Sequence, residues 1–282
     1  MGGIDVAKLD WVLRNKKALV GAVILLILAL VAIFAPLIAP YGPNETRFFP
    51  AQPPSREHLL GTTSLGQDIF SQVVWGTRLT LTVGLVTGSL CALISTTIGL
   101  VAGYFGGWVD EVLSLITNVF LVLPGLPLMI IIAAYITVQS VVPIVVVISI
   151  TGWAWGARVL RSQMMTLKNR DYVKAAIIAG ESPLRIIFCE IFPNMLGLIV
   201  ANFFGAALYA VLSEAGLEFL GLGNVNAVTW GTILYWAQNN QAMLMGQWQW
   251  MVVPGLLIAI LGTSFALLNF AVDEMTNPRL RR

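Results

Sequence analysis

The sequence predicts an all-α membrane protein that crosses the bilayer six times. Hydrophobic residues make up 57% of its 282 residues, charged residues make up only 11%, and the mean hydropathy is +0.84. A soluble domain would carry roughly a quarter charged residues. The apolar runs are continuous and about twenty residues long, as membrane helices require. Barrel strands would instead alternate apolar and polar residues. Helices are therefore expected, because they satisfy their own backbone groups in lipid.

Six apolar runs are long enough to be counted as spans, and the fourth is the shortest. They cover residues 18–39, 79–102, 112–135, 141–156, 196–220 and 251–271. We expect the helix of the fourth span to continue past Arg158 into the cytoplasm. The resulting organisation is an N-terminal segment 1–17, the first span 18–39, an outer segment 40–78, a core 79–272 containing five spans and a cytoplasmic loop 168–195, and a tail 273–282.

The basic residues set the orientation. Thirteen of the sixteen lie before the first span, between the fourth and fifth spans, or after the sixth: Lys8, Arg14, Lys16, Lys17, Arg158, Arg161, Lys168, Arg170, Lys174, Arg185, Arg279, Arg281 and Arg282. The positive-inside rule then places both termini in the cytoplasm of a multi-pass inner or plasma membrane protein. The net charge of +2 reflects this topology and does not indicate nucleic-acid binding. The first run is too long for a cleaved signal and predicts an anchor.

Two outer segments carry distinct patterns. In the second half of 40–78, Ile69, Val73 and Val74 have helical spacing, which predicts a helix lying along the membrane surface. The uncharged segment 223–250 is rich in tryptophan, which favours an interfacial aromatic belt. The alternative is a gate or lip facing a substrate-delivery protein. The tryptophans are Trp230, Trp236, Trp248 and Trp250.

Small residues and prolines mark helix packing in the second and third spans. Pro124 and Pro127 should bend the third span, since each removes a backbone donor. The second span and the turn after it carry glycines at four-residue spacing, which allow helix backbones to approach closely. These glycines are Gly84, Gly88, Gly99, Gly103 and Gly107.

Two carboxylates and two thiols fall in otherwise apolar or basic surroundings. Glu214 and Glu218 lie one turn apart near the outer end of the fifth span. An ionisable group in a span is a functional candidate, but the position near the surface favours a contact at the outer rim or gate, together with Trp230, over an ion relay. The cysteines Cys91 and Cys189 cannot form a disulfide framework and are given no role.

The cytoplasmic segment 170–194 carries the strongest functional signal. Asn169 or Asp171 can cap a first short helix, and Gly180 suits a left-handed residue at its end. Ser182 and Pro183 then provide the N-cap and first turn of a second short helix. We expect that second helix to end at Pro193 and Asn194. Ala175 and Ala176 give the first helix a smooth surface that can enter a groove on a partner.

This segment resembles the EAA loop of the permease subunits of binding-protein-dependent ABC importers. The resemblance rests on the spacing of Lys174-Ala175-Ala176, Gly180 and Pro193. Residues 58–81 resemble the outer signature of the oligopeptide/dipeptide/nickel subclass. Further stretches are similar to the second permease of that subclass: 103–113, 213–223, Trp230-Gly231 and Asn277-Pro278-Arg279.

The resemblance implies an ABC importer type I permease fold with a cytoplasmic coupling helix. This chain would pair with a sister permease within membrane lipid, dock on two ATPase subunits, and receive solute from an extracytoplasmic binding protein. It implies no cofactor in this chain, because ATP and Mg²⁺ would be bound by the ATPases, and the chain has no GxxxxGK[ST] loop. The residues implied in ATPase coupling are Tyr172, Lys174, Ala175, Ala176, Gly180, Glu181, Arg185, Pro193 and Asn194.

Departures from the family pattern leave the solute open, and features that other classes of protein would need are missing from the sequence. Lys174 stands where the family usually has Glu, and Glu190 stands where peptide permeases usually have His. Thr63, Gln67 and Gln72 replace charged residues of the outer signature. Two candidate solutes therefore stay open, namely peptides (oligopeptides or dipeptides) and oligosaccharides, and nickel is a weaker third candidate. A secondary transporter would be expected to show inverted repeats and charged residues at the membrane midplane, and a channel would be expected to show a filter motif. Neither pattern is visible in the sequence. An enzyme would need a catalytic dyad, and none is evident.

Overall fold

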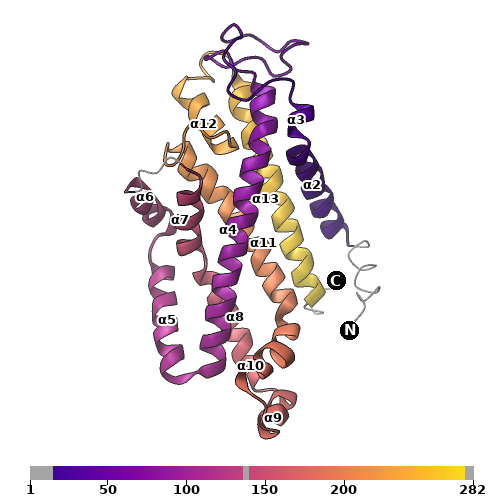
Figure 1. The fold of residues 1–282 in the computed structure, drawn as a ribbon, viewed down its shortest axis with the longest axis vertical. Coiled ribbons are helices and arrows are strands. Elements are labelled where there is room, and N and C mark those ends of the chain that lie inside the picture. Colours follow the sequence, from indigo (N-terminus) through magenta and orange to yellow (C-terminus); the bar gives the residue numbers. More distant parts are fainter. Residues whose placement is uncertain (1–14, 136–139, 277–282) are drawn as a thin grey trace.

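The computed structural model describes residues 15–135 and 140–276, and it confirms the all-α fold. Within these ranges the regular elements are helices, apart from one isolated bridge between Thr62 and Asp68. The basic residues expected before residue 15, and the motif Asn277-Pro278-Arg279, lie outside the described ranges. The helices form an elongated bundle, and the longest of them run along its length (Figure 1).

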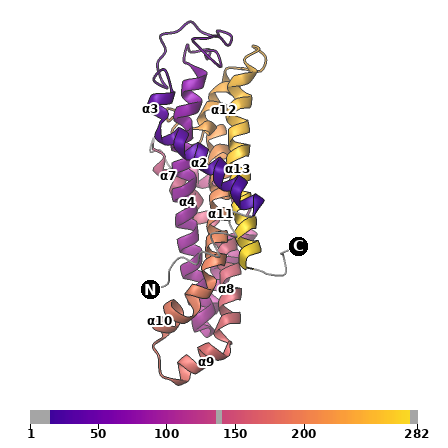
Figure 2. The same ribbon diagram turned by 90° about the vertical axis from the view of Figure 1, so that its right-hand side faces the viewer.

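Four long helices make the frame of the bundle. They are α2 (Lys16–Ile33), α4 (Ile69–Phe105), α11 (Phe192–Phe219) and α13 (Trp248–Thr276). The helix α4 runs through the middle and packs on α11, which in turn packs on α13. The helix α2 lies outside and crosses α13 obliquely (Figure 2). The short α3 (Ala35–Ile38) continues α2 beyond a bend at Phe34.

Two further spans are each built from a bent pair of helices. The pair α5 (Gly107–Val122) and α6 (Gly125–Ala134) meets at 89°, and α7 (Val142–Gly152) and α8 (Ala154–Lys168) meet at 41°. Among the described residues, four single helices are long and apolar enough to cross a membrane, and the number is six when each bent pair is counted as one span. The six-span architecture is therefore supported, and α8 extends past Arg158 as expected.

The bend between α5 and α6 is the one that the prolines predict. Leu123 and Pro124 have extended backbone angles, with ψ of 131° and 114° respectively. Pro124 and Pro127 cannot donate the hydrogen bonds that would continue α5 as a straight helix. The span is consequently broken, which is a larger change than a gentle bend.

The helix α4 begins earlier than expected, at Ile69, so the prediction of a separate surface helix in 40–78 is wrong. Asp68 caps it by accepting a hydrogen bond from the Ser71 amide at 2.7 Å. The apolar face of Ile69 and Val73 is buried against the rest of the bundle, and it continues the span toward the outer segment. Burial of this face explains why the segment stands along the bundle axis.

The glycines of α4 face two different neighbours, which confirms the predicted close packing. A Cβ on Gly88 would lie 2.8 Å from the Ala207 Cα of α11, and one on Gly99 would lie 2.8 Å from the Leu160 Cβ of α8. Gly84 and Gly103 repeat these contacts one turn away. Gly107 differs, because it begins α5 with φ of +50° and touches no neighbouring element.

The two ends of the bundle differ in structure. At one end, called here the α12 end, lie the loop 40–68 and α12 (Trp230–Asn239). At the other, the α9 end, the chain forms α9 (Asp171–Ile178), α10 (Pro183–Arg185) and a π-helical turn (Ile186–Ile191). The first residues of α2 and the last of α13 are tied together by an ion pair between Lys17 and Glu274. The first and last spans therefore have their terminal ends on the same side of the bundle, as an even number of spans requires.

Candidate functional site

The α9 end contains the predicted helix, glycine turn and helix. Gly180 follows Ala179, the C-cap of α9, and its φ of +79° is left-handed. The Gly180 amide donates to Ile177 O at 3.0 Å, and the Glu181 amide donates to Ala176 O at 3.2 Å, so the turn satisfies two of the last carbonyl groups of α9. Ser182 then caps α10 through the Arg185 amide, with Pro183 in the first turn.

Two details of this segment differ from the prediction. Neither Asn169 nor Asp171 caps α9, since Arg170 occupies that position and makes no side-chain cap bond, while Asn169 Nδ2 donates back to Met165 O. Pro193 and Asn194 do not end the second helix, because residues 183–219 form one continuous helix.

The π-helical turn accounts for this continuity. Pro193 has no N–H to pair with the carbonyl four residues before it. The chain widens in the preceding turn, where the Phe192 amide pairs with Ile187 O, five residues back. Such π turns accommodate irregular pairing inside a helix. Asn194 supports the same turn by donating from Nδ2 to Glu190 O at 2.7 Å.

Val173 anchors α9 to the bundle. Its side chain is fully buried, and it packs in one apolar cluster with residues of α8 and of the π-helical turn: Leu160, Met164, Ile186, Ile187 and Ile191. The adjoining α5–α8 junction is held by the ion pair between Asp110 and Arg161. Because close-packed contacts transmit displacement, a movement of α9 should move α8 and α11 with it.

The segment also exposes large apolar side chains, which we call together the α9 patch. Its members are Tyr172, Ile177, Ile178, Leu184 and Phe188, and Ile178 is the most exposed at 87%. Lys174, Ala175 and Gly180 are exposed beside it, and Ala176 is half-buried. Glu181 pairs with Arg185 at 3.5 Å across one helical turn. Exposed apolar patches on a polar rim mark interaction sites.

Of the α9 patch, only Tyr172 was expected from the sequence, as a coupling residue that the family resemblance implies. The exposure of Ile177, Ile178, Leu184 and Phe188 was not predicted. In a chain that is mostly apolar, the sequence does not show which apolar side chains are exposed. The structure shows their exposure because it places them at the α9 end.

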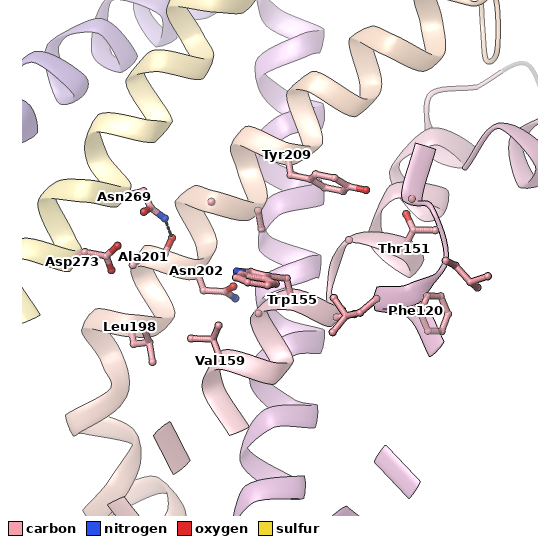
Figure 3. Close-up of a pocket in the computed structure, with 18 residues that line it drawn as sticks. Phe120, Thr151, Trp155, Val159, Leu198, Ala201, Asn202, Tyr209, Asn269 and Asp273 are labelled. Atoms are coloured by element: carbon pink, nitrogen blue, oxygen red, sulfur yellow. Dashed lines mark hydrogen bonds between the residues drawn. The ribbon is translucent and has the colours of Figure 1, made fainter. Parts of the chain in front are cut away.

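A cavity of about 520 Å³, open on one side, lies between the two bent spans, α11 and α13 (Figure 3), and we call it the central cavity. Its walls come from the breaks of both bent spans and from α11 and α13. The residues that line it include Phe120, Leu123, Thr151, Trp155, Leu198, Asn202, Tyr209, Asn269 and Asp273. Broken helices that line a cavity are typical of solute paths in transporters.

The polar side chains of this central cavity are held by neighbouring helices. Asn202 Nδ2 donates to Ser95 Oγ at 2.7 Å, and Asn269 Nδ2 donates to Ala201 O at 2.6 Å. The Tyr209 ring lies against Gly152, where a Cβ would be 2.9 Å from its Cε1. None of these residues was singled out from the sequence, because isolated amides in apolar runs give no spacing pattern.

At the α12 end, Glu214 and Glu218 are buried, which corrects the expectation of carboxylates at an open rim. Glu218 accepts a hydrogen bond from the Thr229 hydroxyl, and a Cβ on Gly231 would lie 2.7 Å from its Oε2. The first turn of α12 therefore covers Glu218. The number of residues along the fifth span predicted that both carboxyl groups lie near its outer end. That number could not show that α12 packs against this end of α11.

Trp230 is likewise a core residue rather than part of an interfacial belt or an open gate. It is fully buried, and its Nε1 donates to Val73 O at 3.0 Å. Trp250 is also fully buried, whereas Trp248 is 57% exposed. The belt interpretation is thus wrong for Trp230 and Trp250, because their rings fill the space between α4, α12 and α13.

Two family models match this chain. Residues 95–282 match the binding-protein-dependent transport system inner membrane component, and residues 12–54 match the N-terminal transmembrane domain of oligopeptide transport permease C. The larger match includes the α9 segment, the central cavity and the buried carboxyl pair.

Several characterised proteins are similar over nearly the whole chain. The oligopeptide transport system permease protein OppC of Bacillus subtilis is 32% identical over 95% of this chain and 87% of its own length. The dipeptide transport system permease protein DppC of Haemophilus influenzae is 32% identical over 95% and 92%. That of Alkalihalophilus pseudofirmus is 35% identical over 95% and 88%. The chain therefore belongs to the binding-protein-dependent transport system inner membrane components, and it is a multi-pass membrane permease of the ABC importer type rather than an enzyme.

Proposed function

We propose that this chain is one of two permease subunits of an ATP-driven importer for oligopeptides or dipeptides. The observation that carries the proposal is the α9 patch, a group of exposed apolar side chains on a segment that Val173 anchors to α8 and to the π-helical turn before α11. The family supports an importer, and the names of the relatives support peptides as the solute.

The α9 patch would enter a groove on an ATPase subunit. Docking of a helical segment into a groove uses exposed apolar side chains, and Tyr172 and Ile178 of α9 and Leu184 of α10 provide them. ATP and Mg²⁺ would be bound by the two ATPase subunits. Lys174 is exposed next to the patch, and its positive charge favours a carboxylate on the facing ATPase surface.

The positive-inside rule orients the molecule in the membrane. The α9 end carries most of the basic residues of the described core, among them Arg170, Lys174 and Arg185, so this end would face the cytoplasm together with both termini. The α12 end would face an extracytoplasmic binding protein. A sister permease would close the open side of the central cavity.

Closure of the ATPases would then push α9, and the packing of Val173 would carry that movement into α8 and α11. Both helices line the central cavity, so a rigid-body shift would change which side of the membrane it opens to. This is alternating access, in which ATP favours one of two states by differential contacts.

The proposal is tested by purifying the tagged chain in mild detergent and reconstituting it with the proteins that co-purify. A second permease, subunits with GxxxxGK[ST] loops, and ATP-dependent uptake of labelled peptides are expected. Uptake of oligosaccharides in place of peptides would change the solute. Uptake driven by an ion gradient without ATP would contradict the importer.

The α9 patch gives a prediction about assembly. Replacing Ile178 by Asp should release the ATPase subunits from the purified complex, because a carboxylate would have to be desolvated in an apolar groove. Since the Ile178 side chain is 87% exposed, the fold of the permease itself should be unchanged. Co-purification of the ATPases with the variant would measure this effect.

Leu244 provides the matched control. It is 83% exposed at the α12 end, and Leu244→Asp should leave the ATPases bound. Equal retention of the ATPases in both variants would show that the α9 patch is not their docking surface.

A further inference from the structure

We propose that a pocket between α4, α5 and α8 binds the phosphate headgroup of an anionic lipid of the cytoplasmic leaflet, and that Arg158 is the residue that holds the phosphate. The pocket has a volume of about 200 Å³ and is called here the α5–α8 pocket. It is separate from the central cavity, since the two share no lining residue. The inference uses the membrane orientation given above and does not depend on the solute.

The α5–α8 pocket is basic. Its polar lining comes from α5 and α8, whereas α4 contributes apolar side chains, and no carboxylate is among the described residues that line it. Basic pockets between membrane helices on the cytoplasmic side are suited to anionic lipid headgroups. The polar residues of the lining are Ser114, Thr117, Asn118, Arg158 and Arg161.

One of the two positive charges in the lining is already balanced. Arg161 forms an ion pair with Asp110, and its Nη2 donates to Asp110 Oδ2 at 2.6 Å. Arg158 donates from Nη2 to the neutral Asn118 Oδ1 at 2.8 Å, and no described carboxylate forms an ion pair with it. Glu111 is exposed next to Asp110, but it does not line the pocket. The pocket therefore keeps the positive charge of Arg158 for a ligand.

The hydrogen-bond donors that remain at the pocket suit a phosphate. The Nε and Nη1 groups of Arg158 donate to no other described residue, and neither does Nδ2 of Asn118. The hydroxyl groups of Ser114 and Thr117 already donate within α5. A guanidinium presents its donors in a planar fork that matches phosphate oxygens. Because Arg158 lies on α8 and Asn118 on α5, a phosphate held by both would tie the two helices together.

The sequence places this pocket at the boundary between hydrocarbon and headgroups. No charged residue precedes Arg158 in α7 or α8, and none follows Glu111 in α5 or α6. Both spans therefore change from charged to apolar sequence beside the pocket. Trp108, at the start of α5, is 75% exposed, and exposed tryptophans are typical of the membrane interface.

The surroundings of the pocket favour a lipid over a free anion. Arg158 and Asn118 are exposed, so the pocket opens to the outside of the bundle, where α5 forms one edge (Figure 1). Beside Asn118, the side chains of Leu115, Val119 and Val122 have helical spacing and are 64%, 50% and 82% exposed. This apolar stripe continues from the pocket toward the membrane, and it would contact the acyl chains of a lipid whose phosphate lies on Arg158.

The experiment locates the lipid by cross-linking. The protein would be purified in mild detergent with the subunits that co-purify, and mixed with phosphatidylglycerol that carries a diazirine at the start of one acyl chain. After irradiation, the labelled residues would be mapped by mass spectrometry. Labels at 114–122 or 155–161 are expected. Labels only elsewhere on the chain, or labelling that disappears when the other subunits are bound, would overturn the proposal.

The variants test the role of Arg158. Replacing Arg158 by Gln should lower labelling at the pocket about five-fold, as for one lost basic contact at a membrane surface. Arg158→Lys keeps the charge and should retain more labelling than Arg158→Gln. The matched control is Arg78→Gln, because Arg78 is also exposed, on α4. It should label as the wild-type protein does. Equal labelling in Arg158→Gln and Arg78→Gln would overturn the proposal.

Competition separates the sources of the phosphate. Unlabelled phosphatidylglycerol should displace the label, phosphatidylcholine should compete more weakly, and inorganic phosphate at the same concentration should not compete. Equal competition by phosphatidylcholine would overturn the role of the net charge. Equal competition by inorganic phosphate would show a site for a free anion and overturn the lipid. The labelling needs neither ATP nor peptide, so its outcome is independent of the test of the proposed function.

Discussion

Replacing Gly180 by proline is expected to abolish ATP-driven uptake while the protein stays in the membrane. Gly180 has φ of +79°, and the proline ring holds φ near −65°. The turn between α9 and α10 would have to reopen, which would displace the α9 patch. No neighbouring atom lies within 4 Å of a Cβ at this position, so the helices of the bundle should pack as before. Uptake in proteoliposomes and the amount of protein in the membrane would be measured together.

The matched control is Gly180→Asn, because asparagine tolerates the left-handed conformation better than other residues with a side chain. It should retain most of the uptake. Normal uptake by Gly180→Pro would contradict the coupling role of this turn. Loss of uptake in both variants would show that a side chain at this exposed position, rather than the backbone angle, disturbs the ATPase contact.

Replacing Gly88 by leucine is expected to destabilise the bundle severely. A Cβ on Gly88 would lie 2.8 Å from both Cα and Cβ of Ala207, and backbone atoms cannot rotate away as a side chain can. The helices α4 and α11 would have to separate along their whole contact. Overpacking typically costs about 1–3 kcal/mol, and this site should lie at or above the upper end. Thermal unfolding in detergent would show a lower Tm or no folded protein.

Gly255→Leu in α13 serves as the control for this substitution. No atom lies within 4 Å of a Cβ at Gly255, so the leucine should fit without displacing a helix. Its Tm should match that of the wild-type protein. Equal Tm values for the two variants would mean that α4 and α11 do not approach as closely as the structure shows.

The membrane spans, the glycine turn and the proline bend could be predicted from the sequence. Apolar runs predict spans because lipid contact requires them, whatever the tertiary packing. The glycine turn at Gly180 was predictable for a similar reason, since only local backbone geometry is involved. The bend near Pro124 followed from the missing amide. In each case the physical cause lies within a few residues of its effect.

The features that were missed depend on contacts between distant parts of the chain. Glu214 and Glu218 are buried because α12 folds back over α11, and the distance along α11 carries no information about this. The segment from Ile69 continues α4 because α12 and α13 offer it an apolar face. Trp230 is in the core for the same reason, although the tryptophan-rich composition of segment 223–250 suggested a belt at the membrane interface.

The sequence by itself determined the class of the molecule, its six spans and the helix–glycine–helix segment, since hydropathy, proline and glycine act locally. Only the tertiary structure decided which residues surround the central cavity, which apolar residues of the α9 patch are exposed, and which carboxyl groups are buried. The physical reason is that burial and cavity formation depend on how whole helices pack. Phe120, Asn202 and Asn269 lie far apart along the chain, and packing alone brings them around one cavity.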